Sequence, residues 1–345
     1  MIAERLTAQL LAGEPARDPL AVVERLLAVQ GQDPRGARLA IRARSSGLSV
    51  SDVDRELSEQ RTLLISWLNR GTLHLVRSED YRWLHALTAP GLLTANARRL
   101  TQEGVTPAAA ERAVTVIERS LADRGPLTRQ QLRERIAAAG VRTEGQALVH
   151  LLMLASLRGL IVRGPMVDAH HAFVLVHDWL GDSKPIDRQR ALAELVRRYL
   201  WGHAPADERD LAKWSGLPLR DVRAGLGAIA PALAQRPDGL LELAASARAA
   251  PTHKPAAELP PPRLLGAFDP LLLGWRSREA ILGSHRTIVT VNGLFRPFAL
   301  VRGRAVATWS MPGGAVQLEP FGRIARKDGA ALATDGEDVV RYLTT

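Results

Sequence analysis

Two glutamine side chains, Gln30 and Gln32, stand one residue apart and are followed at once by Asp33 and Pro34. A glutamine amide both donates and accepts hydrogen bonds and carries no charge. Two such side chains at a chain break could hold one water molecule and aim it at an electrophilic atom. The same residues also suit a polar helix end with no role in chemistry, and the tripeptide alone does not separate these interpretations.

Helix signals on both sides predict that the pair lies between two helices. Apolar residues over 20–27 recur at the spacing of one buried helix face, after an Asp-Pro start at 18–19. Asp33 and Pro34 repeat that start signal, with Asp33 as N-cap, for a helix that runs to about Arg44. The two glutamines are therefore expected where the first of these helices ends and the second begins.

The surrounding elements form a repeating order of helix, helix, helix and hairpin. Apolar runs at 63–67 and 72–76 flank an Asn-Arg-Gly turn, which predicts a hairpin. Similar patterns return after residues 105 and 182, so we expect winged helix-turn-helix modules at 1–105, 106–182 and 183–248. A proline-rich linker is expected at 249–262. Short β-type runs with Asn-Gly and Arg-Gly turns then predict a small antiparallel β-barrel or sandwich at 263–345, including a strand over 287–291 and a final helix or strand near 335–343.

The charge balance favours a polyanionic partner. The chain has 345 residues, a net charge of +10, 42 arginines and 4 lysines. Arginine suits phosphate because its planar guanidinium binds two oxygens at once. Cysteine is absent, no apolar run is long enough to cross a membrane, and no signal peptide is indicated. These features favour an intracellular protein with a polyanionic partner. Separate expectations are that the protein is a monomer and that it lies in the bacterial cytoplasm, associated with the nucleoid when bound to DNA.

Other motifs carry no clear chemistry. No phosphate-binding loop, nucleophile elbow or zinc-protease motif occurs. The pairs His170-His171 and His177-Asp178 fall in a predicted wing, where a solvated or phosphate-facing role is favoured over metal binding. No metal or cofactor is expected. His74 alternates with Leu73 and Leu75, so it is either a satisfied partner of the core, which we favour, or a DNA contact.

Three further runs resemble the winged-helix DNA glycosylases of the AlkZ and YcaQ type. They are Leu27–Arg35, Arg70–Val76 followed by Asp80 and Trp83, and Phe268–Arg276, with Asn292-Gly293 and Arg296-Pro297 later in the chain. The resemblance covers residues 20 to about 310. It implies three tandem winged helices in a C-shaped α+β molecule, a C-terminal β-barrel and hydrolysis of the N-glycosidic bond of alkylated purines.

The resemblance also implies roles for the two glutamines. The AlkZ-like branch carries a Gln-x-Gln catalytic motif and the YcaQ-like branch carries Gln-x-Asp, so Gln30 and Gln32 indicate the first branch. The middle residue of the family motif is usually aliphatic. Gly31 departs from this pattern and leaves the lesion less certain. Members of the AlkZ-like branch are associated with self-resistance to DNA-alkylating natural products and with unhooking of interstrand crosslinks.

An uncharged site suits this reaction because alkylation at N7 makes the purine cationic, so it leaves as a neutral base without an acid. Positioning of water at C1′ is then the remaining task. The partner is double-stranded DNA that carries alkylated purines. Candidate DNA contacts are Arg35, Arg38, His74, Arg276, Arg278, His285 and Arg286.

Two further points bear on function. The lysines stand at 184, 213, 254 and 327, none near the glutamine pair, which argues against a Schiff-base lyase step. The alternative function is a non-catalytic winged-helix transcriptional regulator, since such modules usually bind DNA without chemistry.

Overall fold

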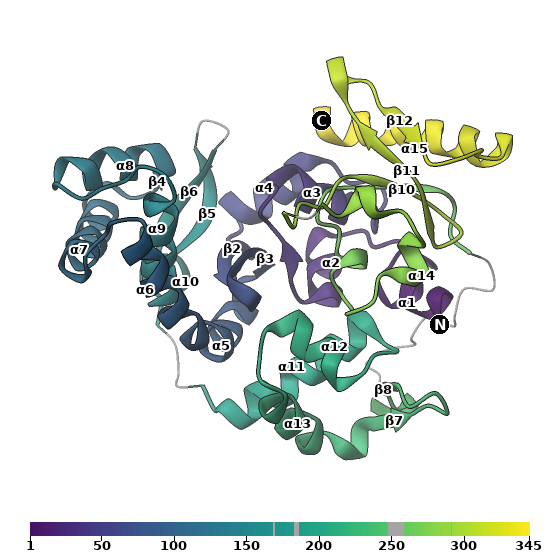
Figure 1. Cartoon of the computed structure of the whole chain (residues 1–345), viewed down its shortest axis with the longest axis horizontal. Coiled ribbons are helices and arrows are strands. Elements are labelled where there is room, and N and C mark those ends of the chain that lie inside the picture. The colour runs from purple at the N-terminus through teal and green to yellow at the C-terminus, as the bar shows by residue number, and fades with distance from the viewer. Residues whose placement is uncertain (168–169, 183–185, 248–258, 291) are drawn as a thin grey trace. The chain divides into compact units, whose positions relative to one another are not determined.

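The computed structural model describes residues 1–167, 170–182, 186–247, 259–290 and 292–345. The chain forms two compact units: Met1–Val53 with Leu192–Thr345, and Asp54–Ala191. Helices and strands occur in both units (Figure 1), so the predicted α+β class is confirmed. None of the described helices combines the length and the apolar character needed to cross a membrane. The module boundaries and the C-shape stay predictions.

The unit Asp54–Ala191 is built around five antiparallel strands in the order β3-β2-β5-β6-β4. The two hairpins that the sequence predicts as separate wings join edge to edge, because Ile65 of β2 pairs with Arg163 of β5. The strands are β2 (Leu63–Leu68), β3 (Thr72–Arg77), β4 (Leu127–Thr128), β5 (Ile161–Val167) and β6 (His170–Leu175). The helices are α5 (Ser78–Thr88), η2 (Pro90–Leu92), α6 (Leu93–Gln102), α7 (Pro107–Arg124), α8 (Arg129–Ala138), α9 (Ala147–Leu157) and α10 (Val176–Leu180), with η1 (Asn69–Gly71) in the first hairpin.

Helix α9 is the third helix of the expected second module, the position of a DNA-reading helix in many winged-helix proteins. Nine of its eleven residues are buried, and only Val149 and His150 are partly exposed. A helix that is apolar on all sides belongs to a core. Helix α9 therefore lies in the core of its unit and has no exposed face that could enter a DNA groove.

The other unit begins with α1 (Ile2–Ala8), α2 (Pro19–Leu26), β1 (Val29–Gln30) and α3 (Pro34–Arg42); α4 (Val50–Ser58) begins at its end. The expected third module has its predicted order of three helices and a hairpin. Its elements are α11 (Arg188–His203), α12 (Glu208–Ser215), α13 (Leu219–Ala228), η3 (Ala230–Ala232), β7 (Leu233–Gln235), β8 (Leu241–Leu243) and η4 (Ala245–Ala247). Asp207 begins α12 with a capping box in which its side chain accepts from the Asp210 amide.

The C-terminal part is a four-stranded antiparallel sheet in the order β12-β11-β10-β9. The expected barrel is not closed among the described residues, because β9 and β12 lie at opposite edges of this sheet. A long helix, α15, packs against the sheet; the final helix or strand expected near 335–343 lies within it and is helical. The elements are β9 (Arg263–Leu265), η5 (Pro270–Leu272), α14 (Glu279–Leu282), η6 (Arg286–Ile288), β10 (Phe298–Val301), β11 (Arg304–Ser310), η7 (Pro312–Gly314), β12 (Gln317–Pro320) and α15 (Arg326–Thr344).

The strand predicted over 287–291 is wrong for the described part of that segment. Residues 286–288 form a single 3₁₀ turn, and pairing there is limited to a bridge between Val289 and Phe295. Residue 291 lies outside the described residues. So do residues 249–258 of the expected linker, whereas Arg263 already begins β9.

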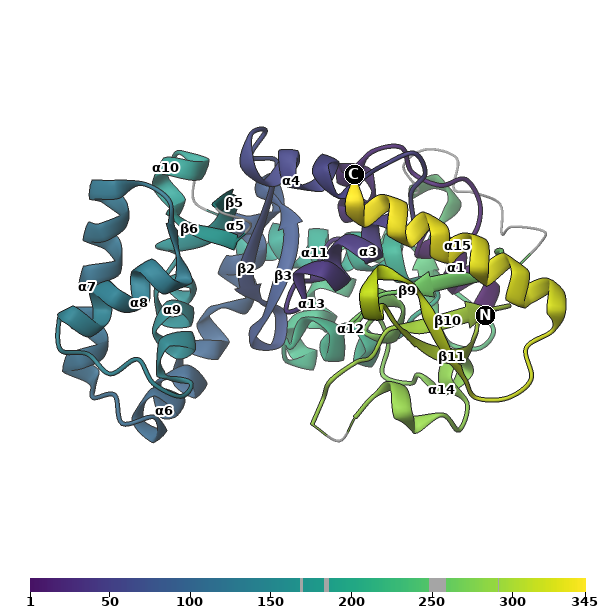
Figure 2. The ribbon, with the colours of Figure 1, turned by 90° about the horizontal axis from the view of Figure 1, so that it is seen from above.

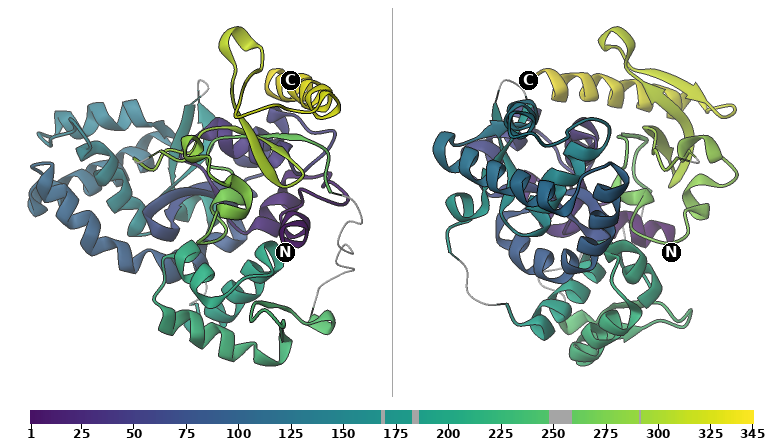
Figure 3. Two further views of the ribbon diagram at one scale, coloured as in Figure 1. Left: turned by 45° about the vertical axis from the view of Figure 1, so that its right-hand side comes forward. Right: turned by 60° about the vertical axis from the view of Figure 1, so that its left-hand side comes forward.

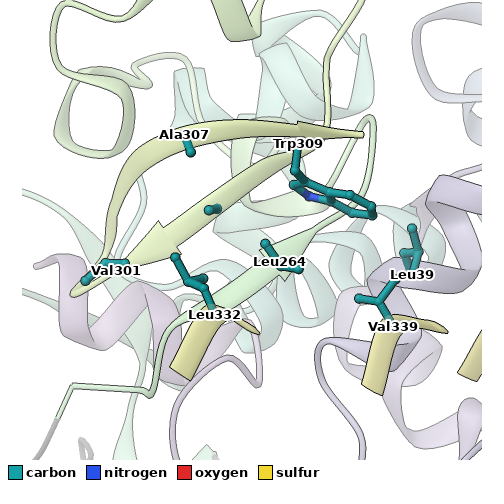
Figure 4. Close-up of a cluster of buried hydrophobic side chains, with 8 residues drawn as sticks. Leu39, Leu264, Val301, Ala307, Trp309, Leu332 and Val339 are labelled. Carbon is teal, nitrogen blue, oxygen red and sulfur yellow. The ribbon is translucent and has the colours of Figure 1, made fainter. Parts of the chain in front are cut away.

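The sheet and helices α3 and α15 share one apolar core (Figure 4). Leu39 from α3 meets Trp309 from β11 and Val339 from α15, with Leu264 and Leu332 in the same cluster. Figure 2 shows α15 running beside α3 and β9. In both views of Figure 3 the hairpin between β11 and β12 projects from its unit. The helix that follows the glutamine pair is thus anchored in the C-terminal sheet.

Candidate active site

Gln30 and Gln32 lie where the sequence predicts, between two short helices. Helix α2 ends at Leu26, Gln30 is the last residue of β1, and α3 begins at Pro34. The predicted N-cap is confirmed, because the Asp33 side chain accepts a hydrogen bond of 3.0 Å from the Arg35 amide. The Asp-Pro start therefore places the first turn of α3 directly after Gln32.

The two amide side chains are joined to each other. Gln30 Nε2 donates a hydrogen bond of 2.6 Å to Gln32 Oε1. Gln30 is 6% exposed, whereas Gln32 is exposed to solvent. The shared bond leaves Gln30 Oε1 as an acceptor and Gln32 Nε2 as a donor. A neutral acceptor and a neutral donor therefore stand side by side, one anchored in the core and the other at the surface.

The chain enters the motif through a tight turn. Leu27 has φ 63° and ψ −45°, and the Ala28 amide donates to the Leu26 carbonyl at 2.8 Å. This is a γ-turn with positive φ at its centre, a conformation that is rare and strained for a residue with a side chain. The Leu27 side chain is fully buried, which holds the residue in this conformation. Gly31 is buried and is not left-handed, so backbone conformation does not require glycine there.

Helix α3 is fixed at its far end by two buried ion pairs. Arg42 binds Asp335 of α15 at 2.9 Å, and Arg44 binds Asp269 at 2.8 Å. Burial of Asp335 works against ionisation, but the Arg42 guanidinium and its hydrogen bonds outweigh this and lower the pKa of the carboxyl below its ordinary value. Asp269 belongs to the Phe268–Arg276 run, so part of this run has a structural role as the partner of Arg44. The sequence alone did not indicate such a role for the run.

Of the two arginines predicted on α3, Arg35 is accessible and Arg38 is not. Arg35 is exposed in the first turn, beside Gln32, and its guanidinium contacts the Met311 sulfur. Arg38 is 6% exposed and donates to the Pro34 carbonyl at 3.0 Å. A guanidinium so enclosed is poorly placed for a phosphate, so burial argues against Arg38 as a DNA contact.

The basic residues predicted in the C-terminal part are mostly engaged in local contacts. Arg276 pairs with Asp207 at 3.0 Å and with Asp210 at 3.5 Å. Arg278 donates to the Leu272 carbonyl, lies over a phenylalanine ring and has its pKa lowered by burial. These contacts indicate structural roles for both arginines.

The other predicted DNA contacts are His285, Arg286 and His74, and the structure describes the side chains of His285 and His74. The His285 ring stacks on Phe321 with centroids 4.3 Å apart. The side chain of Arg286 lies outside the described residues. His74 is 2% exposed, its Nδ1 is 3.0 Å from the Thr72 carbonyl, and burial with the nearby Arg70 charge lowers its pKa to about 3. The favoured interpretation of His74 as a core residue fits this burial.

The described side chains offer no obvious metal site. Within the ranges given above, no three His, Cys, Asp or Glu residues gather as a ligand set would. A cavity of about 180 Å³ lies at the far end of α3, lined by Arg42, Ser46, Arg263 and Arg341 among others. The glutamines do not line it, so it is separate from the candidate site.

Comparisons with known proteins agree with the motif and the fold. The family model described as DNA glycosylase AlkZ-like matches residues 23–342. An interstrand DNA cross-link repair glycosylase from Streptomyces sahachiroi is 26% identical over 356 aligned positions, which cover 95% of this chain and 92% of that protein. The solved structure of Streptomyces sahachiroi DNA glycosylase AlkZ covers 99% of this chain and 95% of that chain, with a TM-score of 0.76 and 24% identity, a likeness of fold.

The chain therefore belongs to the AlkZ-like family of DNA glycosylases. The predicted family and the predicted enzyme class are both confirmed. The family match begins at residue 23 and includes the whole glutamine motif.

Proposed function

We propose that this chain hydrolyses the N-glycosidic bond of N7-alkylated purines in double-stranded DNA, including bulky genotoxin adducts and interstrand crosslinks. The observation that carries the proposal is the amide pair Gln30–Gln32, joined by a 2.6 Å hydrogen bond at the surface end of a core strand. The curated relative is itself named as an interstrand cross-link repair glycosylase, which supports the crosslink part.

The proposed chemistry uses Gln30 Oε1, the Gln30 amide atom outside the shared hydrogen bond. A water molecule donates one O–H to Gln30 Oε1 and turns a lone pair toward C1′ of the damaged nucleotide. The bond from C1′ to the purine breaks, and its electron pair neutralises the cationic base. The water oxygen bonds to C1′ and releases its proton to solvent, because an amide is not a base at neutral pH. Orientation of the water supplies the rate enhancement.

An uncharged pair also sets the proposed selectivity. An unmodified purine leaves as an anion unless an acid protonates it, and neither glutamine is an acid. The site is therefore expected to act on cationic N7-alkyl purines and to leave normal purines intact. The exposure of Gln32 fits a site that reaches a base at the DNA surface, which a crosslinked base requires because it cannot be flipped freely.

Base release from defined lesions tests the proposal. Wild-type protein is incubated with a duplex that carries one N7-methylguanine, one mustard adduct or one N7-linked crosslink, and strand breaks at the abasic site are revealed by hot alkali. We expect release by wild type and loss of release in Gln30→Ala and Gln32→Ala, with DNA affinity retained. Lack of release from every N7-alkyl lesion would overturn the proposal and favour the DNA-binding regulator. A covalent complex trapped by borohydride would contradict the monofunctional mechanism.

A further inference from the structure

Two glycines border the glutamine motif on its two sides, although one is far away in the sequence. Gly202 lies in α11 and packs on the end of α2, before the motif. Gly36 lies in the first turn of α3, after the motif, and packs on the segment that follows β9. Both have helical backbones without positive φ, so their conformations would allow other residues.

The contact at Gly202 is too close for any side chain. A Cβ atom built on Gly202 would come closer than 3.0 Å to the Arg25 carbonyl oxygen, a separation that real Cβ atoms essentially never show. The carbonyl of Gly202 itself accepts a hydrogen bond of 3.0 Å from the buried side chain of Gln9. Helix α11 thus approaches the last turn of α2 backbone to backbone.

Three successive carbonyls at the end of α2 are held by three different contacts. The Glu24 carbonyl accepts a hydrogen bond of 2.7 Å from Arg198 of α11. The Arg25 carbonyl abuts Gly202, and the Leu26 carbonyl accepts from Ala28 within the γ-turn. Helix ends normally leave such carbonyls to solvent or to a local cap. Here α11 contacts two of the three carbonyls, directly before the turn toward Gln30.

The contact at Gly36 fixes the other side of the motif in the same way. A Cβ atom on Gly36 would again lie within 3.0 Å of a backbone oxygen, that of Ala267, and 3.2 Å from the Asp33 carboxylate. Gly266 faces Gly36, because a Cβ on Gly266 would be 3.1 Å from the Gly36 Cα. The start of α3, two residues beyond Gln32, is therefore seated against the C-terminal segment.

We propose that Gly202 and Gly36 are positioning residues for the glutamine pair, each through backbone contact with a segment distant in sequence. The inference rests on the proposed function of that pair. Glycine in a helix costs roughly 1 kcal/mol relative to alanine, so propensity alone favours replacement at both sites. The close approaches give the reason for glycine: any side chain displaces the end of α2 or the start of α3, and with it Gln30 or Gln32.

Single alanine substitutions with a matched control test the proposal. Gly202→Ala and Gly36→Ala add one Cβ at a close contact, whereas Gly227→Ala adds one in helix α13 where no atom lies within 4 Å. The measurements are the single-turnover rate of base release at saturating enzyme and the Kd for the same lesion duplex. We expect the two site variants to slow release by about ten-fold or more with Kd nearly unchanged, because small misplacements of a catalytic group cost rate. The control should match wild type in both.

The outcomes separate this inference from the function on which it rests. If wild type releases base and both site variants match the Gly227→Ala control, the positioning roles are wrong and the proposed function stands. If wild type releases no base from N7-alkyl DNA, both are overturned. A loss of thermal stability without a change in release rate below the melting temperature also overturns the positioning roles.

A second pair of variants covers the case in which Gly202→Ala does not fold. Arg198→Met removes the donor to the Glu24 carbonyl, and Arg198→Lys keeps a cationic donor on a shorter side chain. We expect slower release in Arg198→Met and at least partial recovery in Arg198→Lys, with equal DNA affinity. Equal release rates in wild type and Arg198→Met would count against control of the motif by α11.

Discussion

Arg44 and Asp269 form a two-pronged ion pair in which neither side chain is exposed: Nη2–Oδ1 is 2.8 Å and Nη1–Oδ2 is 2.9 Å. The residues are 225 positions apart. Arg44 also donates to Gln9 at 3.1 Å, and Gln9 in turn binds the Gly202 carbonyl. One buried charge pair therefore links the helix after the glutamine motif, the C-terminal segment and α11.

Loss of Asp269 is expected to destabilise the fold strongly. Asp269→Ala leaves the Arg44 guanidinium buried without its counter-charge, which costs about 3–5 kcal/mol in comparable sites. Urea denaturation followed by circular dichroism measures the change. The control is Arg302→Gln, which removes the pair between the exposed Arg302 and Asp328 at 3.6 Å and should cost less than about 1 kcal/mol. Similar losses in the two variants would contradict the structural role of the buried pair.

The hydrogen bond between the glutamines predicts different effects for two replacements of Gln32. Gln32→Glu keeps an oxygen that accepts from Gln30 Nε2, whereas Gln32→Met has a similar length and no such acceptor. We expect base release by Gln32→Glu to exceed that of Gln32→Met by about ten-fold, since an oriented amide is what positions the water. Single-turnover rates on an N7-methylguanine duplex measure this. Equal rates would mean that the Gln30–Gln32 bond does not orient the site.

Arg35 and Arg276 should differ in how they affect DNA binding. Arg35 is exposed beside Gln32, whereas Arg276 is engaged by two aspartates. Arg35→Gln is therefore expected to reduce the slope of log K against log salt by about 0.9, the value for one lost phosphate contact. Fluorescence anisotropy with an undamaged duplex across a salt series measures the slope. Arg276→Gln should leave it unchanged, and the reverse pattern would restore Arg276 as a DNA contact.

Acid should destabilise the protein partly through His203. Burial lowers the pKa of His203 from 6.5 to about 3. The charges of Arg44 and Arg5 lower it further, whereas the 3.1 Å contact with the Tyr199 carbonyl raises it. The unfolded chain then binds a proton below pH 6.5 that the folded chain does not. The contribution of neutral His203 to the free energy of unfolding is complete above pH 6.5. As the pH falls from 6.5 toward 3, the free energy of unfolding decreases by about 1.4 kcal/mol per pH unit.

Replacement of His203 should weaken that pH dependence. His203→Phe keeps the ring that packs on Tyr199, Trp214 and Trp275, and His203 Nε2 has no hydrogen-bond partner among the described residues. Denaturation at pH 7.5 and pH 5.5 measures the difference in unfolding free energy. The exposed His177 provides the control as His177→Phe. A pH dependence unchanged in His203→Phe would show that this ring does not titrate on unfolding.

Local signals in the sequence predicted the elements around the site well, because these depend on neighbouring residues. The Asp-Pro helix starts and the hairpin of the runs 63–67 and 72–76 follow from caps, turns and alternation, and all are present. The strand expected at 287–291 was wrong, since a short apolar run does not distinguish a strand from a turn packed in a core. The sequence also does not show whether the C-terminal strands close into a barrel, because closure depends on pairing between distant strands.

The partners of the basic residues could not be predicted from the sequence. Arg38, Arg276 and Arg278 have the composition of a DNA surface, but the fold buries the first and brings carboxylates or carbonyls to the others. The Arg276–Asp207 pair joins residues 69 positions apart, and no spacing in the sequence indicates it. The carbonyls that Arg38 and Arg278 meet are near in sequence, but only the fold decides which backbone oxygen each guanidinium reaches.

The sequence by itself determined the Gln-Gly-Gln motif, its position between two capped helices and its membership of a glycosylase family, because residue type and local spacing suffice for these. Only the tertiary structure decided how the motif is held. The close approaches at Gly202 and Gly36 bring backbone atoms of α11 and of the segment after β9 against the helices on either side of the motif. Such contacts arise from packing and leave no spacing in the sequence.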